Sequence, residues 1–147
     1  MQMMERTEPR QRQVVMDTNV LTEAGADRVA RAAEAEARAR GVAPVIAVVD
    51  AGGALMTLRR PDAAQAASVN VSTDKARTAA IFRRPSKDFE DQVRDGRFGA
   101  LQLAGGVTLQ GGIPLLVEGQ AVGAIGVSGE TPDEDEAVAL AGARALS

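Results

Sequence analysis

The sequence contains neither histidine nor cysteine. Histidine is the usual general base and the commonest metal ligand in proteins, and it holds the iron of many haem proteins. Cysteine supplies disulfides, thiolate metal sites and cysteine nucleophiles. The chain must do without all of these groups, and the missing cysteines leave its redox compartment open.

Aromatic residues are also scarce, at 2% of the chain, with no tryptophan or tyrosine. Proteins that bind single-stranded nucleic acid stack the bases on aromatic side chains and attract the phosphates with a basic surface. This chain instead has a formal net charge of -3. We therefore predict no nucleic-acid partner.

Long hydrophobic runs are missing as well. No apolar stretch approaches the roughly 18 to 20 residues that a transmembrane helix needs. The first residues also lack the apolar core of a secretory signal. We therefore expect no membrane partner and take the cytoplasm as the default location.

The chain has 147 residues, of which 45% are hydrophobic and 25% charged, and these values are typical of one globular domain. Residues 1–18 are polar and aperiodic. We expect them to form a flexible leader, followed by a single domain over residues 19–147. The alternative for the leader is that Gln13 to Met16 adds an edge strand.

The segment 111–137, GGIPLLVEGQAVGAIGVSGETPDEDEA, carries the clearest local signals. Two apolar runs flank Glu118-Gly119, where the glycine is free to adopt positive φ, and this pattern predicts a β-hairpin. Thr131 is followed by proline and then by Glu134, which is the signature of a capped helix start. Small residues in the second run indicate that another element packs closely against that strand.

The remaining chain adds three helices, a second hairpin and one short strand. These three helices are expected at about 22–40, 66–82 and 87–94, with Ser86 capping the third, and the other hairpin at 45–60; the helix that begins after Thr131 is expected over 132–146. A short strand at 107–109 brings the number of strands to about five. The prediction is an α/β (α+β) fold in which helices pack on one antiparallel sheet.

Three segments follow one another in a distinctive order: VIAVVDAGGAL with MTLRRPDAA (45–64), STDKARTAAIFRRPS (72–86) and the segment 111–137. Together they resemble the GlcG/HbpS-like family, also called the haem-degrading or DUF336 domain, which occurs too as the C-terminal domain of PduO-type proteins. The resemblance implies a profilin-like or roadblock-like sandwich and a symmetric homo-oligomer, often an octamer. For some members it also implies binding of haem, a corrinoid or iron.

The chain departs from that family's haem chemistry at one point, because without histidine no imidazole can hold the iron. Methionine, lysine or a hydroxyl oxygen would be weaker ligands. Met1, Met3 and Met4 lie at the start of the leader, Met16 lies near its end before the first helix, and Met56 lies in a strand where core packing is the simpler role. The cofactor is thus left open between haem, a corrinoid and none.

The stretch from Asp74 to Thr78 is the sharpest polar cluster. On a helix, Lys75 and Arg77 point to different sides, so they do not clamp one anion between them. We predict that Lys75 lies at a pocket mouth, where it would serve as a base or an anion contact. The alternative is a solvated or ion-paired helix face, or a contact between subunits.

Two glycine pairs, Gly105-Gly106 and Gly111-Gly112, offer backbone N–H groups that can bind an anion, although they fit simple turns equally well. A ligand that approaches Gly111-Gly112 would meet Lys75. Charged residues also mark the ends of the first hairpin. The complete predicted ligand-binding set is Asp50, Arg59, Lys75, Arg77, Gly111 and Gly112, with Arg60 beside Arg59 and with Asp50 alternatively bonding turn amides.

Glu130 is the best-placed lone carboxylate for proton transfer, directly before the last helix. The acids that follow it complement a helix dipole, and we assign no metal ligand, although carboxylate-only iron or magnesium binding stays open. Two functions fit. The first is an oligomeric protein that binds an anionic or tetrapyrrole-like small molecule. The alternative is a cofactor-independent lyase or isomerase that uses Lys75 and Glu130; an assembly protein without a ligand is a third interpretation.

Overall fold

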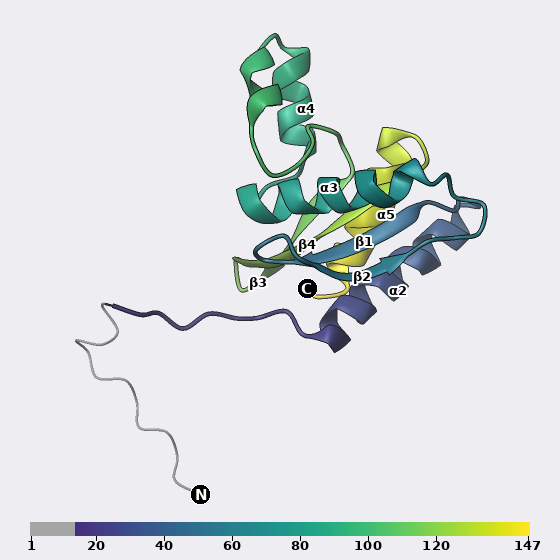
Figure 1. The fold of residues 1–147 in the computed structure, drawn as a ribbon. Helices are drawn as coiled ribbons and strands as arrows, with labels where there is room; N and C mark the ends of the chain where they lie inside the picture. The colour runs from purple at the N-terminus through teal and green to yellow at the C-terminus, as the bar shows by residue number, and fades with distance from the viewer. Residues whose placement is uncertain (1–13) are drawn as a thin grey trace, which may run out of the picture.

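The computed structural model describes residues 14–147, and Figure 1 shows its helices and strands with the labels used below. The numbering of the helices begins at α2. In chain order the elements are α2 (Glu23–Ala39), β1 (Val45–Asp50), β2 (Leu55–Arg59), α3 (Ala67–Phe82), α4 (Lys87–Arg94), the 3-10 helix η1 (Phe98–Gln102), β3 (Gly112–Val117), β4 (Gln120–Ser128) and α5 (Pro132–Arg144).

The four strands form one sheet in the order β2-β1-β4-β3, and each neighbouring pair is antiparallel. The two hairpins predicted from the sequence therefore meet side by side, through their inner strands. β1 and β4 pair in continuous register from Val45 opposite Ser128 to Asp50 opposite Gly123. The expected α/β class with one antiparallel sheet is confirmed.

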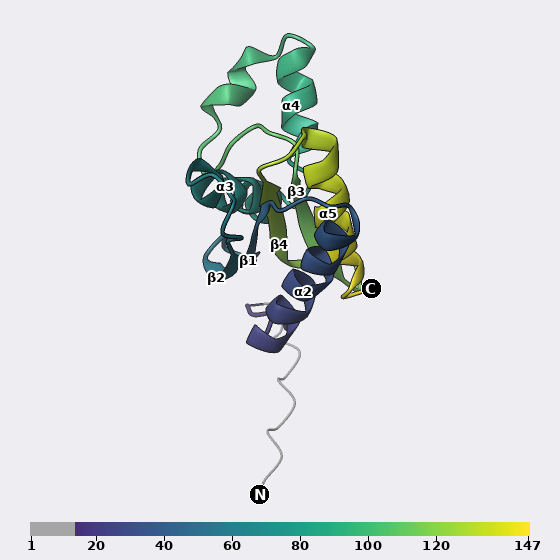
Figure 2. The ribbon, with the colours of Figure 1, turned by 90° about the vertical axis from the view of Figure 1, so that its right-hand side faces the viewer.

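Helices cover both faces of the sheet, as Figure 2 shows. On one face α2 and α5 pack against alternate strand residues such as Ile46, Val48 and Ile125, which belong to the main hydrophobic core. On the other face α3 places alanines against Val49 and Ala124. This division follows from the alternation of side chains along a strand.

The approach of α3 to the sheet is unusually close, because the strand residues beneath it are glycines. A Cβ atom added to Gly126 would lie 2.0 Å from the backbone oxygen of Ser72, and one added to Gly112 would lie 2.1 Å from that of Lys75. These distances leave no room for any side chain. The small residues of β4 thus mark the close packing that the sequence predicts.

Two of the predicted helix starts have the expected caps. Thr22 accepts a hydrogen bond from the N–H of Gly25 at 3.0 Å, and Thr131 accepts one from Glu134 at 3.3 Å. Ser86 is different, because it is buried and does not cap α4. Its hydroxyl accepts from the N–H of Gly112 at 2.8 Å and donates to the carbonyl of Leu109, so it holds the chain that leads into β3.

The expected count of about five strands is one too high for residues 14–147. The stretch 107–109 is irregular because the Thr78 hydroxyl satisfies its backbone, accepting from the N–H of Val107 at 2.8 Å and lying 2.9 Å from its carbonyl. Residues 14–16 form no strand either, and Gln13 lies outside the described residues. The 3-10 helix η1 was not predicted.

None of the helices described between residues 14 and 147 is both long and apolar enough to cross a bilayer.

Candidate functional site

Lys75 lies on the side of α3 that faces the sheet, and only 5% of it is exposed. Its ammonium group donates to the carbonyl of Val127 at 2.9 Å and forms an ion pair with Asp135 at 3.2 Å. The predicted position at a pocket mouth is therefore wrong. The ion-paired alternative describes the contact better, but the pair is buried rather than solvated.

Asp135 belongs to the first turn of α5 and is 2% exposed. One carboxylate oxygen contacts Lys75, and the other accepts from the N–H of Glu130 at 3.0 Å. Burial raises the pKa of Asp135, even though the Lys75 ammonium and the Glu130 amide both oppose that rise. The arrangement connects α3, the end of β4 and the start of α5 through one charged contact.

Gly111 and Gly112 lie directly beside Lys75. Gly111 has a φ of +129°, and an added Cβ would lie 3.0 Å from both the Cδ and the Nζ atoms of Lys75. The structure thus brings these residues together, but the Lys75 side chain fills the space between them. At that point Lys75 packs directly against Gly111.

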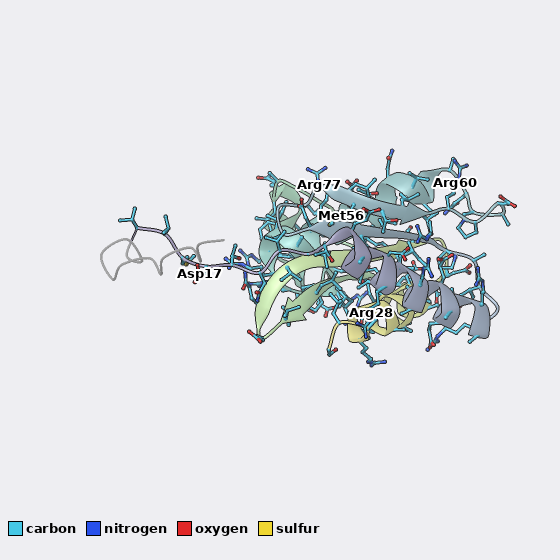
Figure 3. The ribbon with its side chains drawn as sticks, turned by 90° about the horizontal axis from the view of Figure 1, so that it is seen from below. Asp17, Arg28, Met56, Arg60 and Arg77 are labelled. Carbon is cyan, nitrogen blue, oxygen red and sulfur yellow. The ribbon has the colours of Figure 1, made fainter. Side chains whose placement is uncertain are left out.

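The other predicted ligand contacts lie elsewhere. Asp50 accepts hydrogen bonds from the N–H groups of Gly52 and Ala54, both at 2.9 Å, so it stabilises the hairpin turn. Arg77 is exposed and lies against the Gly53 turn. Figure 3 shows Arg77 and Arg60 far apart along one side of the molecule. These residues therefore do not converge on one ligand.

Glu130 is exposed, and its carboxylate accepts from the N–H of Ala43 at 3.1 Å. Its own N–H contacts Asp135, which is the only link that these contacts provide between Glu130 and Lys75. An acid and a base that act on one substrate must face a common cavity. The geometry therefore gives the lyase or isomerase alternative no support.

A hollow of about 330 Å³ lies instead between the C-terminal half of α2 and the β1–β2 hairpin. Three arginines and one glutamate line it together with apolar residues. The residues that decide its chemistry are Glu34, Arg38, Ile46, Leu58, Arg59 and Arg60. Arg59 and Arg60 could be predicted from the sequence as charged residues at a hairpin end. The residues of α2 that line the hollow with them belong to no motif that predicts a site.

Arg59 is held in place by acids on α2. Its guanidinium contacts Glu34 at 3.1 Å, donates to Thr57 at 2.9 Å and pairs with Asp27. Arg38 lies 3.8 Å from the other oxygen of Glu34, and its side chain is 80% exposed. Arg60 makes no ion pair or side-chain hydrogen bond with any residue in the described part of the chain.

The described residues offer few iron ligands. No group of three or more histidine, cysteine, aspartate or glutamate side chains within residues 14–147 is placed to hold a metal ion. Met16 is 90% exposed in the segment before α2, and Met56 is half-buried in β2 against the main core. The residues present therefore do not fit a haem whose iron needs a strong axial ligand, whereas arginines do fit its carboxylates.

Glu136, one residue beyond Asp135, has a buried carboxylate oxygen without a hydrogen-bond partner. Burial raises the pKa of Glu136. The protonated carboxyl therefore stabilises the folded state at acid pH, and this stabilisation is lost as the pH rises through the folded-state pKa. Glu136→Gln should therefore raise the free energy of unfolding by up to about 1 kcal/mol at about pH 8 and change little at about pH 4. Urea unfolding at the two pH values measures this; an equal effect at both would contradict it.

The fold and these contacts define a class: a four-stranded antiparallel sheet with helices on both faces, and a basic hollow at the edge of the sheet. The model of the HbpS-like haem-degrading protein family matches residues 21–144. The chain belongs to that family. This agrees with the resemblance carried by the three sequence segments.

Individual relatives agree with the assignment. The chain is 38% identical to the GlcG protein of Escherichia coli K12 over 109 residues, which are 74% of this chain and 81% of GlcG. The crystal structure of HbpS superposes with a TM-score of 0.83 at 31% identity and covers 90% of this chain and 94% of HbpS. The crystal structure of a PduOC:heme complex superposes with a TM-score of 0.80 at 28% sequence identity, and the match covers 88% of this chain and 96% of that one.

Proposed function

We propose that this protein is an oligomeric small-molecule-binding protein whose ligand is anionic or tetrapyrrole-like. The observation that carries the proposal is the family match over residues 21–144, supported by the similarity to a PduOC:heme complex. The arginine-rimmed hollow supports an anionic ligand in particular. A haem, or a corrinoid, would be held through its acidic groups and its apolar surface.

The absence of histidine gives this proposal a specific spectroscopic consequence. If the iron has no strong protein ligand, haem and metal-free protoporphyrin IX should bind with similar affinity, because the shared carboxylates and ring supply the contacts. Titration followed by the Soret band measures both. A haem affinity far above that of protoporphyrin IX would show that iron coordination dominates after all.

Binding of a smaller anion is tested separately, by the thermal shift of the protein with a panel of carboxylates. A ligand that binds only the folded protein raises its unfolding midpoint. We expect a shift with at least one carboxylate or a Soret change with haem. If neither occurs across the panel, the binding function is refuted.

The proposed self-association has a candidate surface in the projecting lobe of α4 and η1, which Figure 1 shows standing away from the sheet. Its exposed apolar side chains include Phe98 at 68% and Leu101 at 60%. A soluble protein usually covers such side chains when they gather together. We propose that a second copy of this chain covers them, within a homo-oligomer that the family resemblance suggests is an octamer.

Light scattering coupled to gel filtration tests this surface. The wild-type protein should have several times the mass of one chain, and Phe98→Asp with Leu101→Asp should yield a smaller species with an intact far-UV spectrum. Leu55→Asp is the matched control, because Leu55 is 52% exposed but lies on the edge strand β2. A monomeric wild-type protein would contradict self-association itself.

A further inference from the structure

The hollow between α2 and the β1–β2 hairpin combines a volume suited to a small ligand with an excess of arginine over acidic residues in its lining. Its volume of about 330 Å³ falls within the range of roughly 300 to 1,000 Å³ that is usual for ligand sites. Three arginines line it against one glutamate, although the whole chain has a net charge of -3. The site is therefore a local positive region on an acidic protein, which attracts anions.

The carboxylates beside the hollow offset part of this charge and leave Arg60 uncompensated. Glu34 contacts Arg59 at 3.1 Å through one oxygen and lies 3.8 Å from Arg38 through the other, so its charge is already compensated. Asp27 also pairs with Arg59. The Arg59 guanidinium is therefore engaged in contacts within the protein. It lines the hollow but is not available as a ligand contact.

Arg60 has the opposite character. It is exposed, lines the hollow and has no ion-pair or hydrogen-bond partner among residues 14–147. It directly follows β2, an edge strand of the sheet, and Pro61 behind it restricts the backbone. An arginine held by its backbone but with five free N–H donors is suited to a bidentate contact with a carboxylate.

We infer that this hollow binds the carboxylate of a partly apolar small molecule, with Arg60 as the principal anion contact and Arg38 as the second. Ile46, Leu58 and the other apolar residues that line the hollow would contact the apolar body. The inference rests on the proposed binding function and assigns it a site. Two kinds of ligand carry a carboxylate on an apolar body, namely a tetrapyrrole with its acidic side chains and a small aromatic acid.

Two probes distinguish these sources, protoporphyrin IX and 1-naphthoate. The absence of tryptophan and tyrosine leaves the protein almost without intrinsic fluorescence, so both probes can be followed by their own emission. Arg60→Ala should weaken binding about tenfold or more, because it removes a charge-assisted contact. Arg60→Lys should retain part of the affinity, and Arg60→Glu should retain the least.

Arg28→Ala is the matched control, since Arg28 is exposed on α2 but does not line the hollow. Its affinities should equal those of the wild-type protein, and the unfolding midpoint of every variant should stay unchanged. Probe binding that Arg60 variants do not alter would overturn the site and leave the proposed function standing. Loss of 1-naphthoate with unaltered porphyrin binding would limit the site to small acids, and wild-type protein that binds neither probe would overturn both.

Discussion

Replacing Lys75 by alanine should lower the free energy of unfolding by about 3 to 5 kcal/mol. The reason is that Asp135 would stay in a core position with a charge and no cationic partner, keeping the hydrogen bond from the N–H of Glu130. Lys75 is 5% exposed and Asp135 is 2% exposed, so water cannot take over the lost contact. The carbonyl of Val127 would also lose its charged donor. Urea unfolding followed by circular dichroism at neutral pH measures the loss.

The control is Lys87→Ala, because Lys75 and Lys87 are the only two lysines of the chain. Lys87 pairs with Asp91 one turn along α4, and its side chain is 38% exposed, so its removal should leave the unfolding midpoint almost unchanged. Equal effects of the two replacements would contradict a buried role for Lys75.

A double variant separates the stability that the Lys75–Asp135 ion pair contributes from the destabilisation caused by removing only one partner. Lys75→Met with Asp135→Asn removes both charges but keeps an acceptor for the N–H of Glu130. Because burial already raises the pKa of Asp135, the ionised pair pays a large desolvation cost in the native protein. We therefore expect the double variant to be more stable than Lys75→Ala. A double variant that is less stable than Lys75→Ala would contradict the claim that the unpaired charge of Asp135 causes most of the loss.

Gly126→Ala should be the second severe change, with a loss of about 3 kcal/mol. The new Cβ would lie 2.0 Å from the backbone oxygen of Ser72 and 2.5 Å from the nitrogen of Ala76, so the backbone of α3 must move away from β4. A flexible side chain could rotate out of such a contact, but backbone atoms cannot. That displacement would also disturb the Lys75 contact with Asp135. Thermal unfolding measures the loss.

Gly99→Ala provides the comparison, since an added Cβ at Gly99 has nothing within 4 Å. Its conformation does not require positive φ, so the change should be neutral or slightly stabilising. If Gly126→Ala were as mild as Gly99→Ala, the direct seating of α3 on the sheet would be wrong.

Much of the fold could be predicted because its signals are local. Thr22 and Thr131 each cap a helix by bonding the N–H three residues further along the chain, so both helix starts can be predicted from adjacent residues. A glycine turn between two apolar runs likewise predicts each hairpin. The close packing of α3 was predictable in part, because the glycines of β4 have no local purpose. Such features depend on neighbours in the chain, which a sequence displays directly.

The position of Lys75 could not be predicted, because its partner is 60 residues away in the chain. In the sequence, Asp135 is one of several acids in a first helical turn, where a dipole interaction explains them all. The role of Ser86 could not be predicted for a similar reason, since its partners Leu109 and Gly112 are more than 20 residues away in the chain. The arginine hollow depends on how α2 meets β2, and no residue pattern specifies that contact.

Amine labelling of the native protein tests the central claim most directly, namely that the Lys75 amine is enclosed in the core and that ligand binding falls to other residues. Limited acetylation with acetic anhydride, read by peptide mass spectrometry, compares the only two lysines in one sample. We predict that Lys87 is acetylated readily and Lys75 is protected in native protein, and that both react in urea. Acetylation of Lys75 as fast as Lys87 in the native protein would contradict the account.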